Sequence, residues 1–420
     1  MALSAVKNLM ATGSRRVYKW MVALLHIISN NPGKVIAVMS TSLLLLQNMI
    51  RFFQPSMSVQ PWYATNKEWH GPAKFPLCTM DVCFNFSRCD HTKELLVYHY
   101  NTIEPYWPAN YFHALPSMPW YTTDPEKACL FFVFSDKDLP KGSFRPHPNT
   151  LPYWNGGLNH VIVTLADKWS LTNPPEGTIG KASILASRLH ENSIRLGFDI
   201  PVPLPRLWHA PPELQSLKPF DRKYFATFKG TRYLNRAGAF RSNDAFLSMH
   251  NGKDVIVATT CNQVTNNNLR KRFPKKGVGC DRDQILFDKY TFEDLFNSTF
   301  GLAPGGRSPS TFRLLEILGA GSIPVLIVDN YVKPFDNFIE WQHCLLQFPS
   351  SEIHRVLSTL RALSKEEVET RQRYCQAVFE MFLKDDVTLL NTVMLAFKAR
   401  FYGSLANFPL NETYLSIPSN

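Results

Sequence analysis

Short, fully apolar runs separated by longer mixed segments recur along this chain from residue 95 onward. In the first half these runs are Leu95–Tyr100, Leu130–Ser135, His160–Leu165 and Ala182–Leu185. Strands that are apolar on both faces are typical of a parallel sheet covered by helices on each side. A proline-rich segment, residues 201–219, separates this series from a new run at Tyr224–Gly230. We therefore expect two parallel α/β domains, with segment 201–219 as the linker or as a cleft wall between them.

The most informative pattern runs from Phe300 to Asp329. An apolar run, Phe300–Ala303, leads into a glycine-rich loop, and a segment with helical spacing follows before a second apolar run, Ile323–Val328. This order predicts a strand, a loop, a helix and a strand, which is half of a nucleotide-binding sheet.

Helical spacing returns in the C-terminal part of the chain. Ser350 or Ser351 is placed to cap a helix over Glu352–Leu363, and Asp385–Tyr402 ends just before Gly403. Serine at the start and glycine after the end are usual at helix termini. We expect helices over both segments.

The loop after Ala303 carries groups suited to a diphosphate. Gly305 and Gly306 let a ligand approach the backbone closely, Arg307 adds a forked cation, and Ser310 is placed to cap the following helix. Backbone N–H groups at a helix start already favour an anion. The loop matches neither GxGxxG nor a P-loop, so an ordinary turn with a solvated arginine stays open as an alternative.

Two further candidates lie on that helix, three residues apart. Arg313 and Glu316 share one helix face, and the carboxylate of Glu316 can accept hydrogen bonds from ribose hydroxyls. The alternative is an ordinary arginine–glutamate surface pair.

Two cations lie at the end of the run Tyr224–Gly230. Lys229 and Arg232 flank a glycine there and can hold a second phosphate or a sugar carboxylate, although an exposed turn is the alternative. We therefore group Lys229 and Arg232 with the loop residues, as candidates for binding the same phosphorylated ligand.

Candidate catalytic groups lie in the first half. Asp136 and Asp138 follow the run Leu130–Ser135, at the strand end where open α/β sheets present ligands. Their spacing also has the DxD form of metal-dependent transferases, so a metal site is the weaker alternative. His160 opens a strand, where a structural histidine is the alternative to a catalytic base. A second DxD, Asp281-x-Asp283, is discounted because it lies beside a probable disulfide and follows no strand.

The charge pattern of the first 76 residues indicates the cellular compartment of the chain. Residues 1–34 carry lysine and arginine but no acidic residue, and residues 35–50 carry no charge. We expect a cytoplasmic tail over 1–34, a transmembrane signal anchor over 35–52 and a stem over 53–76, with the rest in the lumen of the endoplasmic reticulum and Golgi apparatus. A cleaved signal peptide is the alternative.

Cysteines and glycosylation sequons agree with a luminal location. All eight cysteines follow the predicted anchor, and sequons occur at Asn85, Asn297 and Asn411. A disulfide between Cys261 and Cys280 would close a charged loop and stabilise the fold by about 3 kcal/mol. The trio Cys78, Cys83 and Cys89 is open to disulfide formation or, less readily, to zinc. The pairing of Cys344 and Cys375 stays open.

Composition narrows the choice of partners. A chain of 420 residues with 45% apolar and 19% charged residues has globular composition and room for two domains. Its net charge of +11 favours an acidic partner, and its 13% aromatic content suits sugar-stacking surfaces. Nucleic acid is disfavoured because the sequence has no RNP, zinc-finger or basic-helix motif.

Several of these segments resemble the exostosin family. Its P-x-G-R-x-x-x-[ST]-x-R-x-x-E pattern is matched by Pro304, Gly306, Arg307, Thr311, Arg313 and Glu316. The exostosin-1 branch usually has arginine where Gly305 stands. Further matching segments, in the same order as in the family, are the cysteine trio, Asp124–Phe131, Trp154–His160, Phe228–Tyr233, His250–Cys261 and Cys280–Asp283.

The resemblance implies a fold of the GT-B class, in which two doubly wound Rossmann-like domains face each other across a cleft. The acceptor-side domain would be 77–219 and the donor domain 220–403, followed by a tail over 404–420. The cysteines Cys78, Cys83, Cys89, Cys129, Cys261 and Cys280 would form disulfides. The longer relatives carry a further metal-dependent GT-A domain, which we expect this short form to lack.

The implied activity is inverting transfer of glucuronic acid from UDP-glucuronate to a terminal N-acetylglucosamine of a growing heparan chain, through a β1,4 bond. Catalysis would fall to Asp136, Asp138 or His160 without a metal or other cofactor. The implied partners are the heparan acceptor chain and an exostosin-family N-acetylglucosaminyltransferase. A noncatalytic exostosin-domain subunit that scaffolds a second polymerase is the alternative.

Overall fold

The computed structural model describes residues 78–89, 95–100, 111–134, 150–165, 179–191, 194–234, 239–261, 271, 279–306 and 308–402. All of them belong to one compact unit, which spans residues 66–420. No helix within these ranges is long and apolar enough to span a bilayer. The predicted cytoplasmic tail, anchor, stem and C-terminal tail lie outside the described residues.

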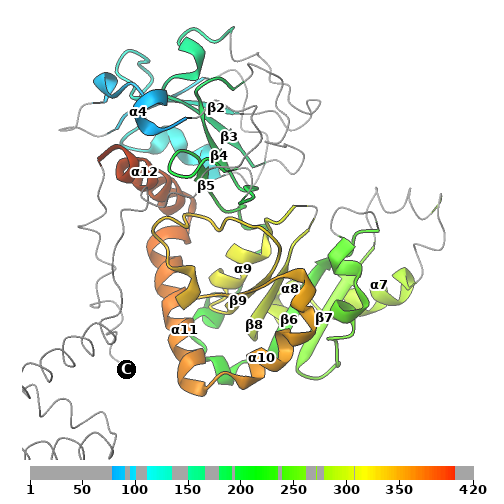
Figure 1. Ribbon diagram of the computed structural model, residues 1–420. Helices are drawn as coiled ribbons and strands as arrows, with labels where there is room; N and C mark the ends of the chain where they lie inside the picture. The colour runs from blue at the N-terminus through cyan, green and yellow to red at the C-terminus, as the bar shows by residue number, and fades with distance from the viewer. Residues whose placement is uncertain are drawn as a thin grey trace, which may run out of the picture. The chain divides into compact units, whose positions relative to one another are not determined.

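The first sheet has five parallel strands in simple sequential order (Figure 1). They are β1 (Val97–His99), β2 (Leu130–Phe134), β3 (His160–Thr164), β4 (Ser183–Ala186) and β5 (Ile200–Pro201). Four of them match predicted runs. The fifth strand corrects the predicted linker over residues 201–219, because Pro201, the first residue of that segment, is the last residue of β5. Among the described strands the order β1-β2-β3-β4-β5 never reverses, so this sheet is not doubly wound there.

The second sheet is also parallel, but its order reverses once. Its strands are β6 (Tyr224–Thr231), β7 (Val255–Thr260), β8 (Ser298–Pro304), β9 (Ile323–Ile327) and β10 (Leu346–Phe348). They are ordered β10-β9-β8-β6-β7, so the chain leaves β6 on one side for β7 and returns on the other side for β8. This is a doubly wound sheet with its switch point between β6 and β8.

Within the described ranges, α4 precedes the first sheet and the other α-helices follow β6. The α-helices are α4 (Met80–Cys83), α5 (Asp244–Leu247), α7 (Cys280–Lys289), α8 (Phe292–Phe296), α9 (Arg313–Gly319), α10 (Val356–Ala362), α11 (Lys365–Val378) and α12 (Asp386–Tyr402). Short 3-10 segments are η3 (Phe86–Arg88), η4 (Tyr111–Ser117), η6 (Asn155–Gly157), η7 (Pro212–Ser216), η8 (Pro219–Asp221), η9 (Ala239–Ser242), η11 (Trp341–His343) and η12 (Ser350–Arg355). A π-helical turn, η13 (Phe379–Leu383), joins α11 to α12.

The helix predicted over Glu352–Leu363 is split. Its first part is the 3-10 segment η12, and α10 begins only at Val356, with no side chain capping its start. The cause is local, since Glu352 departs from helical dihedral angles.

The last helix belongs with the first sheet. Asp385 accepts a hydrogen bond from the Thr388 N–H at 2.8 Å and so caps the start of α12. Further along, the Phe397 ring lies 6.1 Å from that of Phe132 in β2, and Asn391 accepts from the Trp120 indole at 3.0 Å. The predicted donor domain, 220–403, thus ends in a helix that packs on the other sheet.

A glycine sets the spacing between α9 and the second sheet. A Cβ on Gly301, in β8, would lie 2.6 Å from two side-chain carbons of Ile317. Only a residue without a side chain lets α9 approach the strand this closely. The helix and the loop before it are thereby held against the carboxyl end of the sheet.

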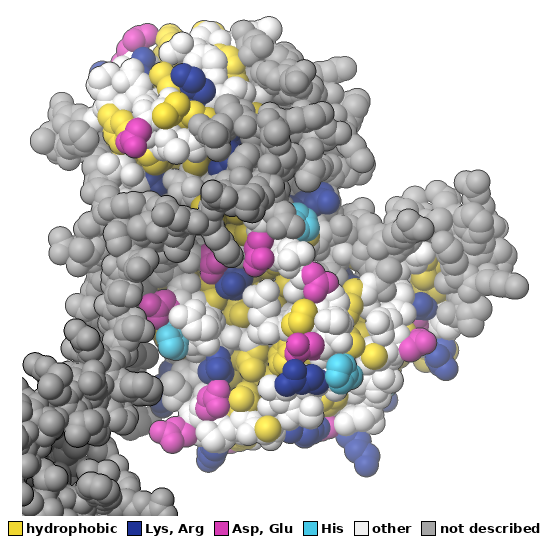
Figure 2. Space-filling view, viewed as in Figure 1, with side chains coloured by type: hydrophobic (Ala, Val, Ile, Leu, Met, Phe, Trp, Pro, Cys, Tyr) yellow, Lys and Arg dark blue, Asp and Glu magenta, His cyan; other side chains and the backbone are white. Residues whose placement is uncertain are grey.

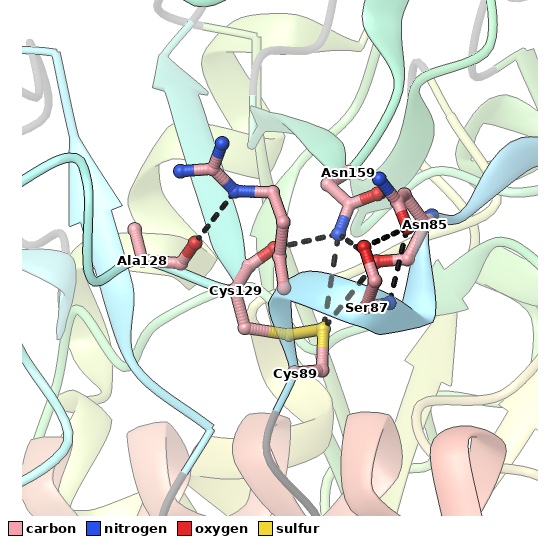
Figure 3. The surroundings of a disulfide bond; sticks show 7 residues. Asn85, Ser87, Cys89, Ala128, Cys129 and Asn159 are labelled. Atoms are coloured by element: carbon pink, nitrogen blue, oxygen red, sulfur yellow. Dashed lines mark hydrogen bonds between the residues drawn. A yellow bond between two sulfur atoms is a disulfide. The ribbon is translucent and has the colours of Figure 1, made fainter.

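All eight cysteines are paired. The disulfides are Cys78–Cys83, Cys89–Cys129, Cys261–Cys280 and Cys344–Cys375. The six cysteines expected in disulfides are therefore confirmed, and the open pairing of the last two is settled. Figure 3 shows the Asn159 side chain beside one of these disulfides, with its amide directed to the Cys129 carbonyl, at 2.8 Å.

Candidate nucleotide-binding site

The carboxyl ends of β6 and β8 meet at the switch point of the second sheet. Crossovers that leave two neighbouring strands in opposite directions open a crevice beyond those ends, and open α/β sheets bind their ligands there. Strand β8 ends at Pro304 and is followed by Gly305 and Gly306. The glycine-rich loop predicted from the sequence therefore lies where this topology favours a ligand.

A buried arginine that the sequence patterns did not single out holds this loop. Arg241 is 8% exposed and donates hydrogen bonds to the main-chain oxygens of Pro304 at 2.8 Å, Gly305 at 3.1 Å and Thr231 at 3.3 Å. Its guanidinium thus joins the ends of β6 and β8. Nothing in its neighbours Phe240 and Ser242 marks it as special. It is one of three arginines, with Arg232 and Arg236, between a predicted strand and the next apolar run, so the sequence gives no signal that singles it out.

The loop backbone is further ordered by its own groups. The Gly305 N–H donates to the Ile327 oxygen at 3.1 Å, and the Gly306 N–H donates to the Ser308 oxygen at 2.9 Å. Ser308 and Ser310 are buried and share a hydrogen bond between their hydroxyls, at 2.8 Å. The loop is therefore shaped before any ligand arrives. Arg307 lies outside the described residues.

The prediction that Ser310 caps α9 is wrong. The helix begins at Arg313, and the Thr311 hydroxyl accepts from the Arg313 N–H at 3.3 Å, while the Ser310 hydroxyl is bonded to Ser308. The cause is that the loop is longer than the spacing suggested, so the serine side chain stabilises the loop.

Arg313 and Glu316 form an ion pair, as their spacing allows, but it is not a surface pair. Nη2 of Arg313 lies 2.5 Å from Oε2 of Glu316, whose side chain is fully buried. The other oxygen, Oε1, accepts from the N–H groups of Leu207 and Trp208, both at 3.2 Å. Glu316 thus ties α9 to the proline-rich segment, and any contact with ribose would have to compete with these bonds.

Burial sets the ionisation of this carboxyl group. Removal from water raises the pKa of Glu316 to about 7, against the opposing pull of Arg313 and the two backbone N–H groups. Burial also lowers the pKa of Arg313. The ionisation of Glu316 and Arg313 therefore depends on whether water, protein or a ligand surrounds the two side chains.

Lys229 lies close to this pair. Lys229 and Arg313 line the same small cavity, and both stand over the Phe292 ring, with 5.2 Å and 4.8 Å to its centroid. The Lys229 ammonium donates to the main-chain oxygens of Tyr290, at 2.7 Å, and Phe287. Burial lowers the pKa of Lys229 to about 8. The structure thus brings two predicted donor-binding cations together, with Lys229 already bonded to the end of α7.

The side chain of Arg232 contacts the start of α7. Its Nη2 lies 2.6 Å from Oδ2 of Asp283 and 3.5 Å from Sγ of Cys280, at the start of α7. This pairing also accounts for the discounted Asp281-x-Asp283 pattern, because the second aspartate neutralises an arginine. No three His, Cys, Asp or Glu side chains of the described ranges gather as a metal-binding group.

The structure favours the structural alternative for His160. The ring is fully buried at the start of β3, with Nε2 2.9 Å from the Tyr100 hydroxyl and Nδ1 2.8 Å from the Leu158 oxygen. Burial lowers the pKa of His160 to about 4. A neutral imidazole whose two nitrogens both form hydrogen bonds is typical of a histidine that stabilises the protein core. The other two catalytic candidates, Asp136 and Asp138, lie outside the described residues.

Two of the three predicted sequons lie in described parts of the chain. Asn85 is exposed, and its Oδ1 accepts from the Ser87 N–H at 3.0 Å. Asn297 is half-buried at the end of α8, and its Oδ1 accepts from the Lys223 N–H at 3.0 Å. Asn411 lies outside the described residues. The environment of Asn85 is thus the more open of the two.

Charge is spread over the surface. On the face drawn in Figure 2, lysine and arginine side chains alternate with acidic ones over the part that carries the second sheet. Exposed ion pairs such as Arg361–Asp254, at 2.8 Å, and Arg355–Glu352, at 3.0 Å, also bring charges of opposite sign together. The net charge of +11 therefore forms no single basic block on this face.

Comparison with known proteins places this geometry in a family. The model of the exostosin GT47 domain matches residues 98–363. Exostosin-1c of Danio rerio is 30% identical over 361 residues, which cover 80% of this chain and 48% of that protein. Exostosin-1 of Drosophila melanogaster is 32% identical over 340 residues, which cover 74% of this chain and 44% of that protein. The chain thus spans less than half the length of either relative.

Solved structures show weaker likeness. The N-terminal domain of Candida albicans trehalose-6-phosphate phosphatase has a TM-score of 0.38 at 9% identity and covers 68% of this chain and 72% of its own. AviGT4, a glycosyltransferase of avilamycin A biosynthesis, has a TM-score of 0.31 at 13% identity and covers 74% and 98%. The family model, in contrast, spans more than half of the chain, and the chain belongs to the exostosin GT47 family.

Proposed function

We propose that this chain is a glycosyltransferase of the GT-B class that holds a nucleotide-sugar donor at the switch point of its second sheet. One observation carries this proposal: the Gly305–Gly306 loop follows β8 at that switch point and is held in place by Arg241. Membership of the exostosin GT47 family supports it. The loop also matches the family's P-x-G-R pattern at Pro304, Gly306 and Arg307.

We propose UDP-glucuronate as the donor and the terminal N-acetylglucosamine of a heparan chain as the acceptor, joined by a β1,4 bond with inversion. A base from the first sheet's side, Asp136 or Asp138, would remove the proton from the acceptor 4-hydroxyl as its oxygen attacks the anomeric carbon in line. The bond from that carbon to the diphosphate breaks as the new bond forms. Acceptor and donor specificity rest on the family resemblance.

The charge on the departing diphosphate would be taken up by side-chain cations. Arg307, from the loop, and Arg313, at the start of α9, are the groups we assign to it. A charged hydrogen bond contributes about 1.5–3 kcal/mol, or one to two decades in rate when it forms only in the transition state. We therefore propose that transfer needs no metal ion.

We further propose that the chain is a type II membrane protein of the endoplasmic reticulum and Golgi apparatus. It would act in a hetero-oligomer with an exostosin-family N-acetylglucosaminyltransferase, because an alternating polymer requires both additions. The four disulfides suit an oxidising compartment.

A specific observation favours a noncatalytic alternative, in which the domain scaffolds a second polymerase. Three predicted donor-binding cations already have partners within the protein: Lys229 with the Tyr290 oxygen, Arg232 with Asp283, and Arg313 with Glu316. A donor site would have to rearrange these pairs or depend on Arg307.

The test is radiolabelled transfer from UDP-glucuronate to a heparan oligosaccharide that ends in N-acetylglucosamine. The full chain is assayed alone and with the candidate partner, in EDTA. We expect transfer in EDTA and a loss of at least tenfold in Arg307→Ala, with Arg355→Ala, a change at an exposed ion pair, as the matched control. Absence of transfer in both mixtures, combined with a rise in the partner's own activity, would establish the scaffold.

A further inference from the structure

A second polar pocket lies away from the switch point. It has a volume of about 780 Å³ and is formed where η3, the turn at η6 and the starts of β2 and β3 meet. The residues that line it include Asn85, Arg88, Phe131, Tyr153, Trp154 and Asn159. Its volume lies in the usual range for small-molecule sites.

The position of the pocket separates it from the proposed reaction. Phe131 is the second residue of β2, and the pocket residue Asn159 directly precedes β3, so the pocket lies at the amino ends of these strands. Reactions on parallel α/β sheets take place beyond the carboxyl ends. The donor loop follows the carboxyl end of β8 in the other sheet, so it does not lie at this edge.

The pocket contains a fixed cation. Arg88 donates from Nε to the Ala128 oxygen at 3.2 Å and from Nη2 to the Pro125 oxygen at 2.9 Å, and its guanidinium carbon stands 5.3 Å from the Phe131 centroid. Within the described ranges, Nη1 has no hydrogen-bond partner and no carboxylate pairs with this arginine. One edge of the guanidinium is therefore available to an acidic ligand.

Aromatic rings provide a platform beside that cation. Tyr153 is 38% exposed and stacks on Phe131, with ring centroids 5.8 Å apart and planes 20° apart. Trp154 is 5% exposed, and its indole N–H is buried without a partner among the described residues. An unsatisfied buried donor has a cost that a ligand oxygen would remove. Aromatic faces with nearby N–H donors are the groups that bind the C–H face and the hydroxyls of a pyranose.

The backbone that lines the pocket is held rigidly at two asparagines. Asn155 and Asn159 have φ of 39° and 58°, which side-chain-bearing residues rarely adopt. Asn159 is locked from both ends: its Oδ1 accepts from the Asn85 N–H at 2.6 Å, and its Nδ2 donates to the Cys129 oxygen at 2.8 Å, beside the Cys89–Cys129 disulfide (Figure 3). The pocket is thus preformed, which lowers the cost of binding.

We propose that this pocket binds an acidic pyranose of a glycan, with the sugar ring on Tyr153 and its carboxylate or sulfate group at Arg88. The Trp154 indole N–H donates to a ring hydroxyl, and the Asn155 amide lies at the exposed rim. This site is additional to the proposed donor and acceptor sites and is expected whether or not the chain is catalytic.

Two sources can supply such a sugar. One is a free acidic polysaccharide, and the other is a glycan attached to the chain's own Asn85, whose exposed side chain lies on the pocket wall. Arg88 favours the free acidic chain, because the sugar linked directly to asparagine is neutral. Enzymatic removal of N-glycans distinguishes the two sources.

The experiment is amide hydrogen exchange on the full chain, before and after N-glycan removal. The probe is an unsulfated hexasaccharide of alternating glucuronic acid and N-acetylglucosamine, and the neutral control is an N-acetylglucosamine hexamer. We expect the acidic probe to slow exchange in residues 151–159 at least threefold, before and after glycan removal, and the neutral hexamer to have a smaller effect. Slowing only after glycan removal would assign the pocket to the Asn85 glycan and overturn the assignment to a free acidic chain.

Two variants test the contacts. Tyr153→Ala and Arg88→Gln should each abolish the slowing in 151–159, while Phe220→Ala and Arg355→Gln, at an exposed ring and an exposed arginine elsewhere, should retain it. Tyr153 is partly exposed, so its variant remains informative if Arg88→Gln folds poorly. An unchanged exchange rate in 151–159 with the acidic hexasaccharide, or slowing retained in Tyr153→Ala, would overturn the proposal.

Discussion

Arg241 and Gly305 are joined by a hydrogen bond from the guanidinium Nε to the main-chain oxygen of Gly305, at 3.1 Å. The same guanidinium reaches Pro304 and Thr231, so one side chain fixes the ends of both strands at the switch point. A loop that is held this way loses less entropy when a diphosphate binds.

Replacement of Arg241 should therefore affect both the loop and the fold. Arg241→Met removes three hydrogen bonds to main-chain oxygens, and the loss of a buried hydrogen bond costs about 1–3 kcal/mol. We expect a lower midpoint of thermal unfolding and at least tenfold weaker UDP binding. Arg355→Met, at an exposed ion pair with Glu352, should change neither. Wild-type UDP affinity in a folded Arg241→Met protein would show that the arginine does not position the site.

Glu316 should contribute a pH dependence to stability. Its pKa is raised from 4.5 to about 7 in the folded protein, so between these values the folded state holds a proton that the unfolded state has lost. The free energy of unfolding therefore falls as pH rises from about 4.5 to about 7. In Glu316→Gln this component is absent.

The measurement is thermal unfolding of both proteins at pH 5 and pH 7.5. Glu316→Gln should lose less stability than the wild type on going from pH 5 to pH 7.5. An identical change with pH in the two proteins would mean that Glu316 keeps an ordinary pKa.

His160 should prove structural. His160→Phe keeps a ring against Phe131, whose centroid lies 4.9 Å away, but loses the bonds to Tyr100 and Leu158. We expect a loss of about 1–3 kcal/mol in the free energy of unfolding. The transfer rate at a temperature well below the midpoint should stay within about threefold, whereas removal of a general base typically costs about 100-fold or more. A loss of that size in a stable His160→Phe protein would make the histidine catalytic.

The disulfides should differ in their effect on stability. Cys344–Cys375 has a sequence separation of 31 and Cys78–Cys83 a separation of 5. In the chain-entropy account these bonds contribute about 4 and about 2 kcal/mol. The double variant Cys344→Ser/Cys375→Ser should therefore unfold at a lower temperature than Cys78→Ser/Cys83→Ser. The reverse order would show that packing around the first pair outweighs loop length.

Much of the fold could be read from local pattern. Strands β2, β3, β6, β8 and β9 coincide with apolar runs because each is buried on both faces. The short strand β5 was missed because only Ile200 and Pro201 take part in it, inside a proline-rich segment. The order of strands in the first sheet is set by crossovers between distant segments, which local pattern does not encode.

The position of the site could be predicted from the sequence, but the hydrogen bonds that connect its residues could not. The glycine loop and the spacing of Arg313 and Glu316 indicated the place, since both are local features. That Glu316 binds Leu207 and Trp208 could not be read, because these residues lie more than 100 positions away. The role of Arg241 could not be predicted for another reason: its partners are main-chain oxygens, which every residue type carries.

The central claim is that the loop after β8 binds the diphosphate of a nucleotide, and calorimetry of UDP binding to the full chain tests it most directly. We expect one site, at least tenfold weaker binding of UMP than of UDP, and a loss of at least tenfold in UDP affinity for Arg307→Ala, with Arg355→Ala unchanged. An absence of UDP binding, or equal UDP affinity in Arg307→Ala, would contradict the claim.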